Sequence, residues 1–124
     1  MQFIPSKKKG IAHLFAATKY SFGGARRLLK EEAARHELAG FILVSILFFL
    51  AGVSIQKHIA FFVLFLILIA LEALNTAIEE IVDVVSPTYS TAARHAKDLG
   101  SLAVFCMIVV NVIYVCHVLI MPWL

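Results

Sequence analysis

Residues 59–85 read IAFFVLFLILIALEALNTAIEEIVDVV, a strongly apolar half followed by a row of carboxylates. The first 13 residues carry no charge, as in a helix that crosses a membrane, and Glu72, Glu79, Glu80 and Asp83 then follow. A charged side chain near the bilayer centre costs about 2.5–3.5 kcal/mol on insertion scales. Because a simple membrane anchor gains nothing from repeated charges, the sequence predicts an active site inside the membrane.

Two further apolar runs predict the fold class. Residues 38–55 are 18 consecutive residues without Asp, Glu, Lys or Arg, and residues 99–124 are 26 such residues. About 20 helical residues cross a bilayer core, and 61% of the chain is hydrophobic. We therefore expect an all-α membrane protein with three transmembrane helices. We expect a single domain over residues 1–124, with spans at 32–53, 59–85 and 93–121.

The first 30 residues are polar and basic. Residues 1–9 have the composition of a flexible basic arm. Residues 10–30 place apolar side chains between Lys and Arg, which is typical of an amphipathic helix that lies in the membrane interface. Gly23 and Gly24 could let this helix bend or break. Such a helix could anchor the chain to anionic lipid or grip a polyphosphate, and the sequence leaves both alternatives open.

Basic residues also predict the orientation of the spans. Eight of the eleven Lys and Arg residues precede residue 38, two (Arg94 and Lys97) lie between the uncharged runs of the second and third spans, and only Lys57 lies between the first and second spans. Positive residues concentrate on the cytoplasmic side of membrane proteins. The N-terminus and the loop at 86–92 are therefore expected in the cytoplasm, and the loop at 54–58 and the C-terminus outside.

The second span carries a polar stripe. Spacings of three and four residues put Glu72, Asn75, Glu79 and Asp83 on one helix face, with Glu80 at its edge. Such a stripe faces other helices or a water-filled site rather than lipid. A metal ion, basic residues or bound protons must neutralise these carboxylates. Since magnesium combines carboxylate and phosphate ligands, the cytoplasmic end suits a magnesium–nucleotide complex, and the deeper Glu72 suits a reactant in the bilayer.

Two more polar clusters flank this stripe. Residues 93–101 read ARHAKDLGS, in which Lys97 could hold a phosphate and Asp98 could join the metal site or pair with Lys97. The alternative is a simple charge pair beside the membrane. Glu31, Glu32, Arg35 and Glu37 stand at the start of the first span, where Glu31 and Arg35 have the spacing of a helical ion pair. Solvated surface charges are the alternative there.

Three classes of function remain at this point. No phosphate-binding loop of the Walker type and no protein-kinase glycine-rich loop is present, so a nucleotide must be held in another way. A carboxylate-relay transporter would spread titratable groups over the whole bilayer depth, whereas these groups crowd the cytoplasmic half. A non-catalytic scaffold leaves the polar stripe and the Lys97–Asp98 pair unexplained. The pattern favours an enzyme.

The motifs EALNTAIEEIVD (72–83) and AKDLGS (96–101), in this order and after EEAARHE (31–37), resemble the prokaryotic diacylglycerol kinase family over nearly the whole chain. The resemblance implies a small bacterial inner-membrane lipid kinase. It implies a homotrimer with composite sites between subunits and transfer of the γ-phosphate of ATP, with Mg²⁺, to a lipid hydroxyl. The string KDLGS, with Ser101, favours diacylglycerol over undecaprenol as the lipid. No nucleic-acid partner is expected.

The resemblance also implies roles for single residues. Glu72 matches the general base, Glu79 a metal-binding glutamate, Asn75 the asparagine between them and Asp83 the acidic residue that closes the motif. Lys97 and Asp98 match a nucleotide-binding pair. The remaining nucleotide contacts are expected from Thr88, Tyr89, Ser90 and Tyr20, and from His13, which stands where relatives often have arginine.

A second metal-binding glutamate is implied at the start of the first span, where two registers compete. The usual spacing of four residues before an arginine selects Glu31, with Arg35. The local Glu-Ala-Ala string selects Glu32 but needs a deletion inside a helix, which would rotate the following residues by about 100°. The sequence therefore favours Glu31.

Overall fold

The computed structural model describes residues 9–124, and this part of the chain is helical without a β-strand. Most of the predicted basic arm, residues 1–8, lies outside the described residues. The four helices are α1 (Ile11–Leu28), α2 (Glu32–Leu50), α3 (Ile55–Val85) and α4 (Thr91–Ile120), and a 3₁₀ turn (Met121–Trp123) follows.

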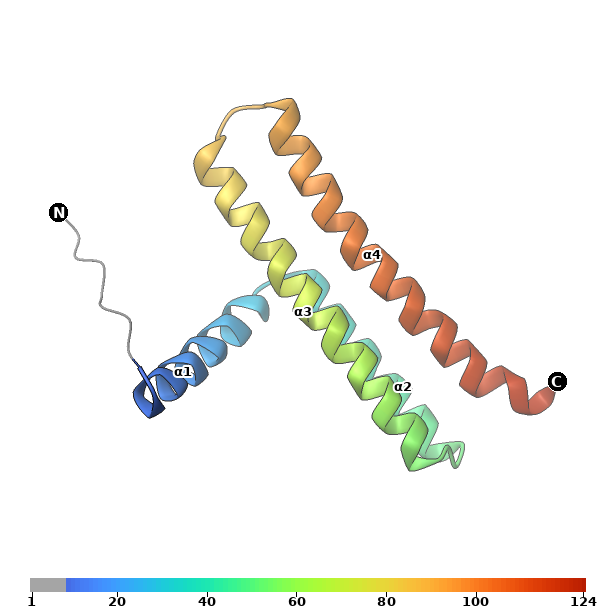
Figure 1. Cartoon of the computed structure of the whole chain (residues 1–124). Coiled ribbons are helices and arrows are strands. Elements are labelled where there is room, and N and C mark those ends of the chain that lie inside the picture. The colour runs from blue at the N-terminus through green and yellow to red at the C-terminus, as the bar shows by residue number, and fades with distance from the viewer. Residues whose placement is uncertain (1–8) are drawn as a thin grey trace.

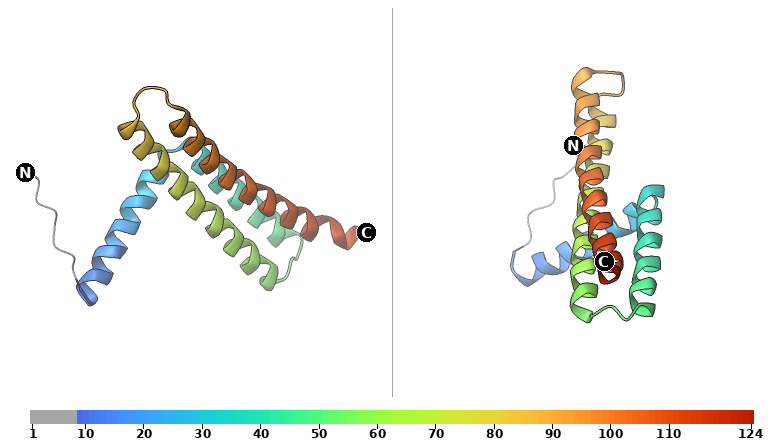
Figure 2. Two further views of the ribbon diagram at one scale, coloured as in Figure 1. Left: turned by 45° about the horizontal axis from the view of Figure 1, so that its top comes forward. Right: turned by 90° about the vertical axis from the view of Figure 1, so that its right-hand side faces the viewer.

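Three of these helices are long and apolar enough to cross a membrane: α2, α3 and α4 with its 3₁₀ extension. This confirms the prediction of an all-α protein with three candidate spans. In Figure 1, α3 and α4 run side by side in opposite directions and α2 packs along the first half of α3, while α1 projects away from the bundle. The views in Figure 2 agree with this arrangement.

The hydrophobic core lies at the end of the bundle far from the α3–α4 loop. Phe48, Phe61 and Val118 are its buried residues, one from each long helix. Phe41 stacks on Phe65 with ring centroids 4.2 Å apart, which joins α2 to α3. In α4, the buried Asn111 donates from Nδ2 to the Leu64 carbonyl at 3.3 Å. This is the interhelical hydrogen bond that a buried amide in a membrane helix needs.

The connection between α2 and α3 differs from the predicted boundaries. Helix α2 ends at Leu50 instead of Val53, because Gly52 adopts a positive φ of 69°. The Val53 and Gly52 amides then donate to the Phe48 and Phe49 carbonyls, the bonds of a Schellman C-cap. Helix α3 starts at Ile55 instead of Ile59, since the polar residues 56–58 form its first turn rather than a loop.

The turn between α1 and α2 also corrects the sequence analysis. Helix α1 continues through Gly23 and Gly24 without a break. The expected Glu31–Arg35 ion pair is wrong: Arg35 Nη1 donates to the carbonyls of Leu29 and Lys30, at 3.1 and 3.0 Å. The reason is that Glu31 has an extended backbone (φ −78°, ψ 130°) ahead of α2, so helical spacing does not apply to it.

Candidate active site

Glu72 lies in the middle of α3 and is buried, with 6% of its surface exposed. The carboxyl group of Glu37, on α2, lies next to that of Glu72. The Oε2 atom of Glu37 is buried and receives no hydrogen bond from the described residues. Sequence analysis grouped Glu37 with solvated charges and missed this pairing, because only the packing of α2 on α3 brings the two residues together.

One turn along the stripe, Asn75 donates from Nδ2 to Glu79 Oε1 at 3.3 Å. The opposite side of the Asn75 amide packs on Gly100 of α4, where an added methyl group would overlap the amide oxygen. Gly100 is therefore part of the site, since it lets α4 approach α3 closely enough to fix Asn75. The motif AKDLGS contains this glycine, but its spacing alone does not reveal the contact.

The mouth of the site is a polar cavity between the ends of α3 and α4. Lys97 Nζ lies 2.5 Å from Asp83 Oδ1, and Arg94 Nε lies 3.8 Å from Asp98 Oδ2. The alternative pairing of Asp98 with Lys97 is therefore wrong, because neighbouring helical residues point about 100° apart. The cavity has a volume of about 380 Å³. It is lined by residues from both helices and the loop, among them Asp83, Thr88, Tyr89, Ser90, Lys97 and Asp98.

The loop that closes this cavity is held by its own hydroxyl groups. Ser90 caps α4 by accepting a hydrogen bond from the Ala93 amide at 3.1 Å. Ser86 donates to the Thr88 carbonyl at 2.9 Å and lies 3.1 Å from the Ser90 hydroxyl. Tyr89 is exposed at the tip. The loop thus has a defined shape and offers an aromatic side chain at the edge of the polar cavity.

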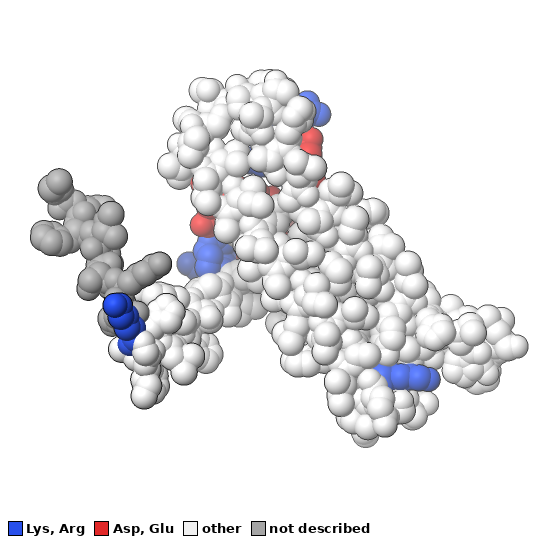
Figure 3. Space-filling model, in the orientation of Figure 1, with Lys and Arg blue, Asp and Glu red and all other residues white. Residues whose placement is uncertain are grey.

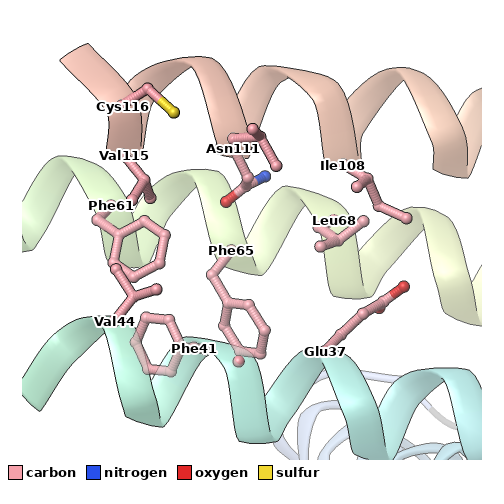
Figure 4. Close-up of a pocket in the computed structure, with 12 residues that line it drawn as sticks. Glu37, Phe41, Val44, Phe61, Phe65, Leu68, Ile108, Asn111, Val115 and Cys116 are labelled. Carbon is pink, nitrogen blue, oxygen red and sulfur yellow. The ribbon is translucent and has the colours of Figure 1, made fainter.

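A second cavity, of about 280 Å³, runs along the bundle below Glu37. Its walls come from α2, α3 and α4, and Figure 4 shows Phe41, Phe61 and Phe65 along it with the Glu37 carboxyl at one end. We call it the apolar cavity. It suits a hydrocarbon chain whose polar end reaches the carboxyl pair Glu37–Glu72.

At the junction of α1 and α3, Arg27 contacts two carboxylates. Its Nη1 lies 2.8 Å from Glu31 Oε1, and its Nε donates to Glu80 Oε1 at 2.6 Å. The hydrogen bonds that Arg27 donates to Glu31 and Glu80 raise the pKa of Arg27 above its ordinary value. Glu32, one residue after Glu31, is largely exposed and has only His36 near it among the ion pairs of the described chain, at 3.8 Å.

Some predicted residues lie apart from this site within one chain. His13 and Tyr20 are exposed on α1, which projects away from the α3–α4 loop (Figure 1). Ser101 is exposed on α4. On the face drawn in Figure 3, charged side chains gather near the α3–α4 loop and along α1 and its junction with the bundle, and the long middle of the bundle is uncharged.

The carboxylates of this site meet the ligand requirements of magnesium only in part. Within residues 9–124, no three His, Cys, Asp or Glu side chains lie close enough to hold a metal ion. Magnesium, however, is often bound by one or two carboxylates together with substrate phosphates.

Comparison with known proteins identifies what the chain is similar to. The family model of prokaryotic diacylglycerol kinase matches residues 19–119. A protein named diacylglycerol kinase from a Sinorhizobium species is 52% identical over 92% of this chain and 83% of its own length. Proteins of the same name from Haemophilus influenzae (38% identical; 80% of this chain, 85% of theirs) and Escherichia coli strain K12 (32%; 89% and 91%) also match.

Proposed function

The chain belongs to the prokaryotic diacylglycerol kinase family, and we propose that it transfers the γ-phosphate of ATP to the free hydroxyl of diacylglycerol, yielding phosphatidic acid and ADP. The observation that carries this proposal is the path of polar side chains along one face of α3, from Asp83 at the cavity of the α3–α4 loop, past Glu79 and Asn75, to the buried Glu72. From Asp83 to Glu72 the path rises about 16 Å along α3. A nucleotide entering from water can thereby meet a lipid in the membrane.

We assign Glu72 as the general base. A carboxylate beside the reacting hydroxyl accepts its proton as the oxygen attacks the γ-phosphorus, and general-base catalysis of this kind contributes about 10²–10⁴-fold to a rate. Glu37 Oε2 is buried beside Glu72 without a hydrogen-bond partner among the described residues, which marks the carboxyl pair as a binding point for a hydroxyl whose single proton Glu72 accepts. The hydroxyl then lies between the two carboxyl groups, and the base is held in a water-poor environment.

The lipid is proposed to enter sideways from the bilayer. The apolar cavity ends at Glu37 and has aromatic walls that accommodate an acyl chain. Diacylglycerol is favoured over undecaprenol because each of the three relatives compared above is named diacylglycerol kinase. For the same reason a carboxylate-relay transporter is not favoured.

The nucleotide is proposed to occupy the polar cavity. Lys97 would hold phosphate oxygens and Asp98 would accept hydrogen bonds from the sugar or base, while Thr88, Tyr89 and Ser90 surround the adenosine. Magnesium would be held by Glu79 with Glu31 or Glu32, and would neutralise charge on the transferring phosphoryl group. Asn75 orients Glu79 from within the stripe.

We propose that three chains assemble and that the sites are composite. His13 and Tyr20 match nucleotide-contacting residues, yet α1 leads away from the polar cavity of its own chain (Figure 2). A neighbouring subunit can supply them. In a bacterial inner membrane, the α3–α4 loop and α1 would face the cytoplasm and the C-terminus would lie outside, which agrees with the distribution of Lys and Arg.

Phosphate transfer from labelled ATP tests the proposed function. Purified protein in mixed micelles receives diacylglycerol or undecaprenol, with and without Mg²⁺. We expect labelled phosphatidic acid only in the presence of the metal. Labelling of undecaprenol instead would overturn the assigned lipid, and labelling of neither lipid by folded protein would overturn the kinase assignment.

A further inference from the structure

The amide of Asn111 is a polar group in the middle of the apolar cavity. The side chain lines the cavity from α4, and only 8% of its surface is exposed. Among the described residues that line the cavity, Glu37 is the one charged side chain, and the others are apolar apart from Cys116. Figure 4 shows Asn111 between Ile108 and Val115, opposite the aromatic rings of the other two helices. The cavity therefore suits hydrocarbon but contains one polar group away from its carboxyl end.

Both hydrogens of the Asn111 amide nitrogen are already used inside the bundle. Nδ2 donates to the Leu64 carbonyl at 3.3 Å and to the Met107 carbonyl at 2.8 Å. Because carbonyl oxygens only accept hydrogen bonds, the amide atom that faces them must be the nitrogen. The oxygen, Oδ1, is directed into the cavity (Figure 4) and receives no hydrogen bond from the described residues. The bond between α4 and α3 thus accounts for only half of this amide.

An acceptor in this position needs a donor from a ligand. Taking a polar group out of water without a hydrogen-bond partner has a free-energy cost. An unsubstituted acyl chain in the cavity would surround Asn111 Oδ1 with methylene groups and offer it no donor. The acceptor is satisfied only by a trapped water molecule or by a bound lipid that carries a donor at the same depth.

The depth of Asn111 below the carboxyl pair defines where that donor would lie on the lipid. Asn111 contacts the carbonyl of Leu64, which precedes Glu72 by eight residues on α3. Eight residues of α-helix rise about 12 Å. When the reacting hydroxyl lies at Glu37 and Glu72, the part of the lipid beside Asn111 Oδ1 is therefore the middle of an acyl chain. The ester oxygens of diacylglycerol lie closer to the reacting hydroxyl and are acceptors themselves.

We propose that Asn111 is a specificity-determining residue of the lipid site: its Oδ1 accepts a hydrogen bond from a hydroxyl group near the middle of an acyl chain, so that diacylglycerol with such a hydroxylated chain is preferred to the unsubstituted lipid. This inference rests on the proposed function and deepens it by naming the class of acyl chain. The hydroxyl on the acyl chain is a recognition group, held about 12 Å from Glu72, and phosphate is transferred to the glycerol hydroxyl.

Three lipids compared on the wild-type protein test the proposal. They are diacylglycerols whose acyl chains are equal in length and carry no hydroxyl, one hydroxyl near the middle, or one hydroxyl at the far end. We expect kcat/KM in mixed micelles to be about three- to tenfold higher for the mid-chain hydroxyl than for the unsubstituted lipid, the range of one neutral hydrogen bond. The terminal hydroxyl should give no gain. Equal values for all three lipids, or equal gains for both hydroxylated lipids, would overturn the proposal.

Asn111→Leu removes the acceptor and keeps a side chain of similar size. The preference for the mid-chain hydroxyl should disappear in this variant. Ile108→Leu is the matched control, since Ile108 lines the same cavity from α4 without a polar group, and it should keep the preference. Because each variant is judged by the ratio of its rates on two lipids, a general loss of activity or of folded protein cancels. An undiminished preference in Asn111→Leu, or its loss in Ile108→Leu alone, would contradict the role of Oδ1.

Lipid retention without ATP or Mg²⁺ separates this inference from the proposed function. Native mass measurements give the fraction of wild-type protein that retains each of the three lipids. The mid-chain hydroxyl should increase the affinity for the lipid about three- to tenfold, and Asn111→Leu should remove the increase. Equal retention of the three lipids by the wild-type protein would overturn the role of Asn111. If the wild-type protein phosphorylates no lipid, the proposed function fails, while retention still tests Asn111 by itself.

Discussion

At the scale of single residues, the carboxyl pair Glu37–Glu72 combines burial with a missing hydrogen-bond donor. Burying a polar group without a hydrogen-bond partner is unfavourable, so a substrate hydroxyl that donates to this pair would be bound favourably. The sequence surroundings of the two residues explain why only Glu72 was predicted as a site residue. Glu72 stands inside an apolar run, whereas Glu37 stands among charges at its edge.

Replacing Glu72 with Gln keeps the shape of the side chain and removes its basicity. We expect turnover to fall by about 10²–10⁴-fold, the range of a lost general base, with little change in nucleotide affinity. Glu37→Gln is the companion variant and should lose less activity, because an amide still hydrogen-bonds the hydroxyl. Rates in mixed micelles and binding of a labelled nucleotide measure the two effects. More than a tenth of normal turnover in Glu72→Gln would refute the assignment.

A larger side chain at Gly100 is predicted to displace Asn75. In Gly100→Ala the new methyl group overlaps the Asn75 amide oxygen, so Asn75 must shift away from Glu79. Overpacking of this kind costs about 1–3 kcal/mol, and we expect a lower unfolding midpoint together with a higher Mg²⁺ requirement. Gly23→Ala is the control, because nothing lies within 4 Å of a methyl group there. Equal behaviour of the two variants would contradict the close contact.

At the scale of the elements, the antiparallel pair α3–α4 builds the polar cavity. The Asp83–Lys97 ion pair joins the two helices at the mouth, and the Ser86–Ser90 hydrogen bonds shape the loop. Both members of the ion pair are partly exposed, with 65% and 44% of their side chains accessible. Exposed ion pairs contribute little to stability, at most about 1 kcal/mol. Asp83 and Lys97 are therefore expected to contribute to ligand binding rather than to folding stability.

Lys97→Met tests this expectation. A charge-assisted hydrogen bond to phosphate contributes about 1.5–3 kcal/mol, so the KM for ATP should rise about tenfold or more, while the unfolding midpoint stays nearly constant. Lys57→Met is the control, since Lys57 belongs to the first turn of α3 at the other end of that helix. Steady-state kinetics at fixed Mg²⁺ separate KM from kcat. A large loss of stability without a change in KM would assign Lys97 a structural role.

At the scale of the whole molecule, the described chain is an open arrangement of three long helices and one projecting helix (Figure 1). Many large apolar side chains of the bundle are exposed in the isolated chain, as in lipid-facing or subunit-facing surfaces. The predicted nucleotide contacts on α1 do not reach the polar cavity of the same chain. Assembly would both cover apolar surface and complete the sites.

Subunit mixing is the test of composite sites. Assemblies made only of Glu72→Gln, or only of Tyr20→Glu, should be nearly inactive. In mixed assemblies, α1 of a Glu72→Gln subunit supplies the missing tyrosine to a neighbour whose Glu72 is intact, so activity should return. Native mass measurements verify that the subunits have mixed and give the number of chains. Mixed assemblies without any recovery would contradict a site shared between subunits.

What the sequence determined by itself is the number of spans, the helical class and the family, because these follow from run lengths, hydropathy and contiguous motifs. The polar stripe of α3 also follows from helical periodicity. Tertiary structure alone decided which charges meet. Arg27 of α1 pairs with Glu80 of α3, and Lys97 of α4 pairs with Asp83 of α3 instead of Asp98. Such partners depend on where a helix begins and on how it packs, and a linear pattern contains neither.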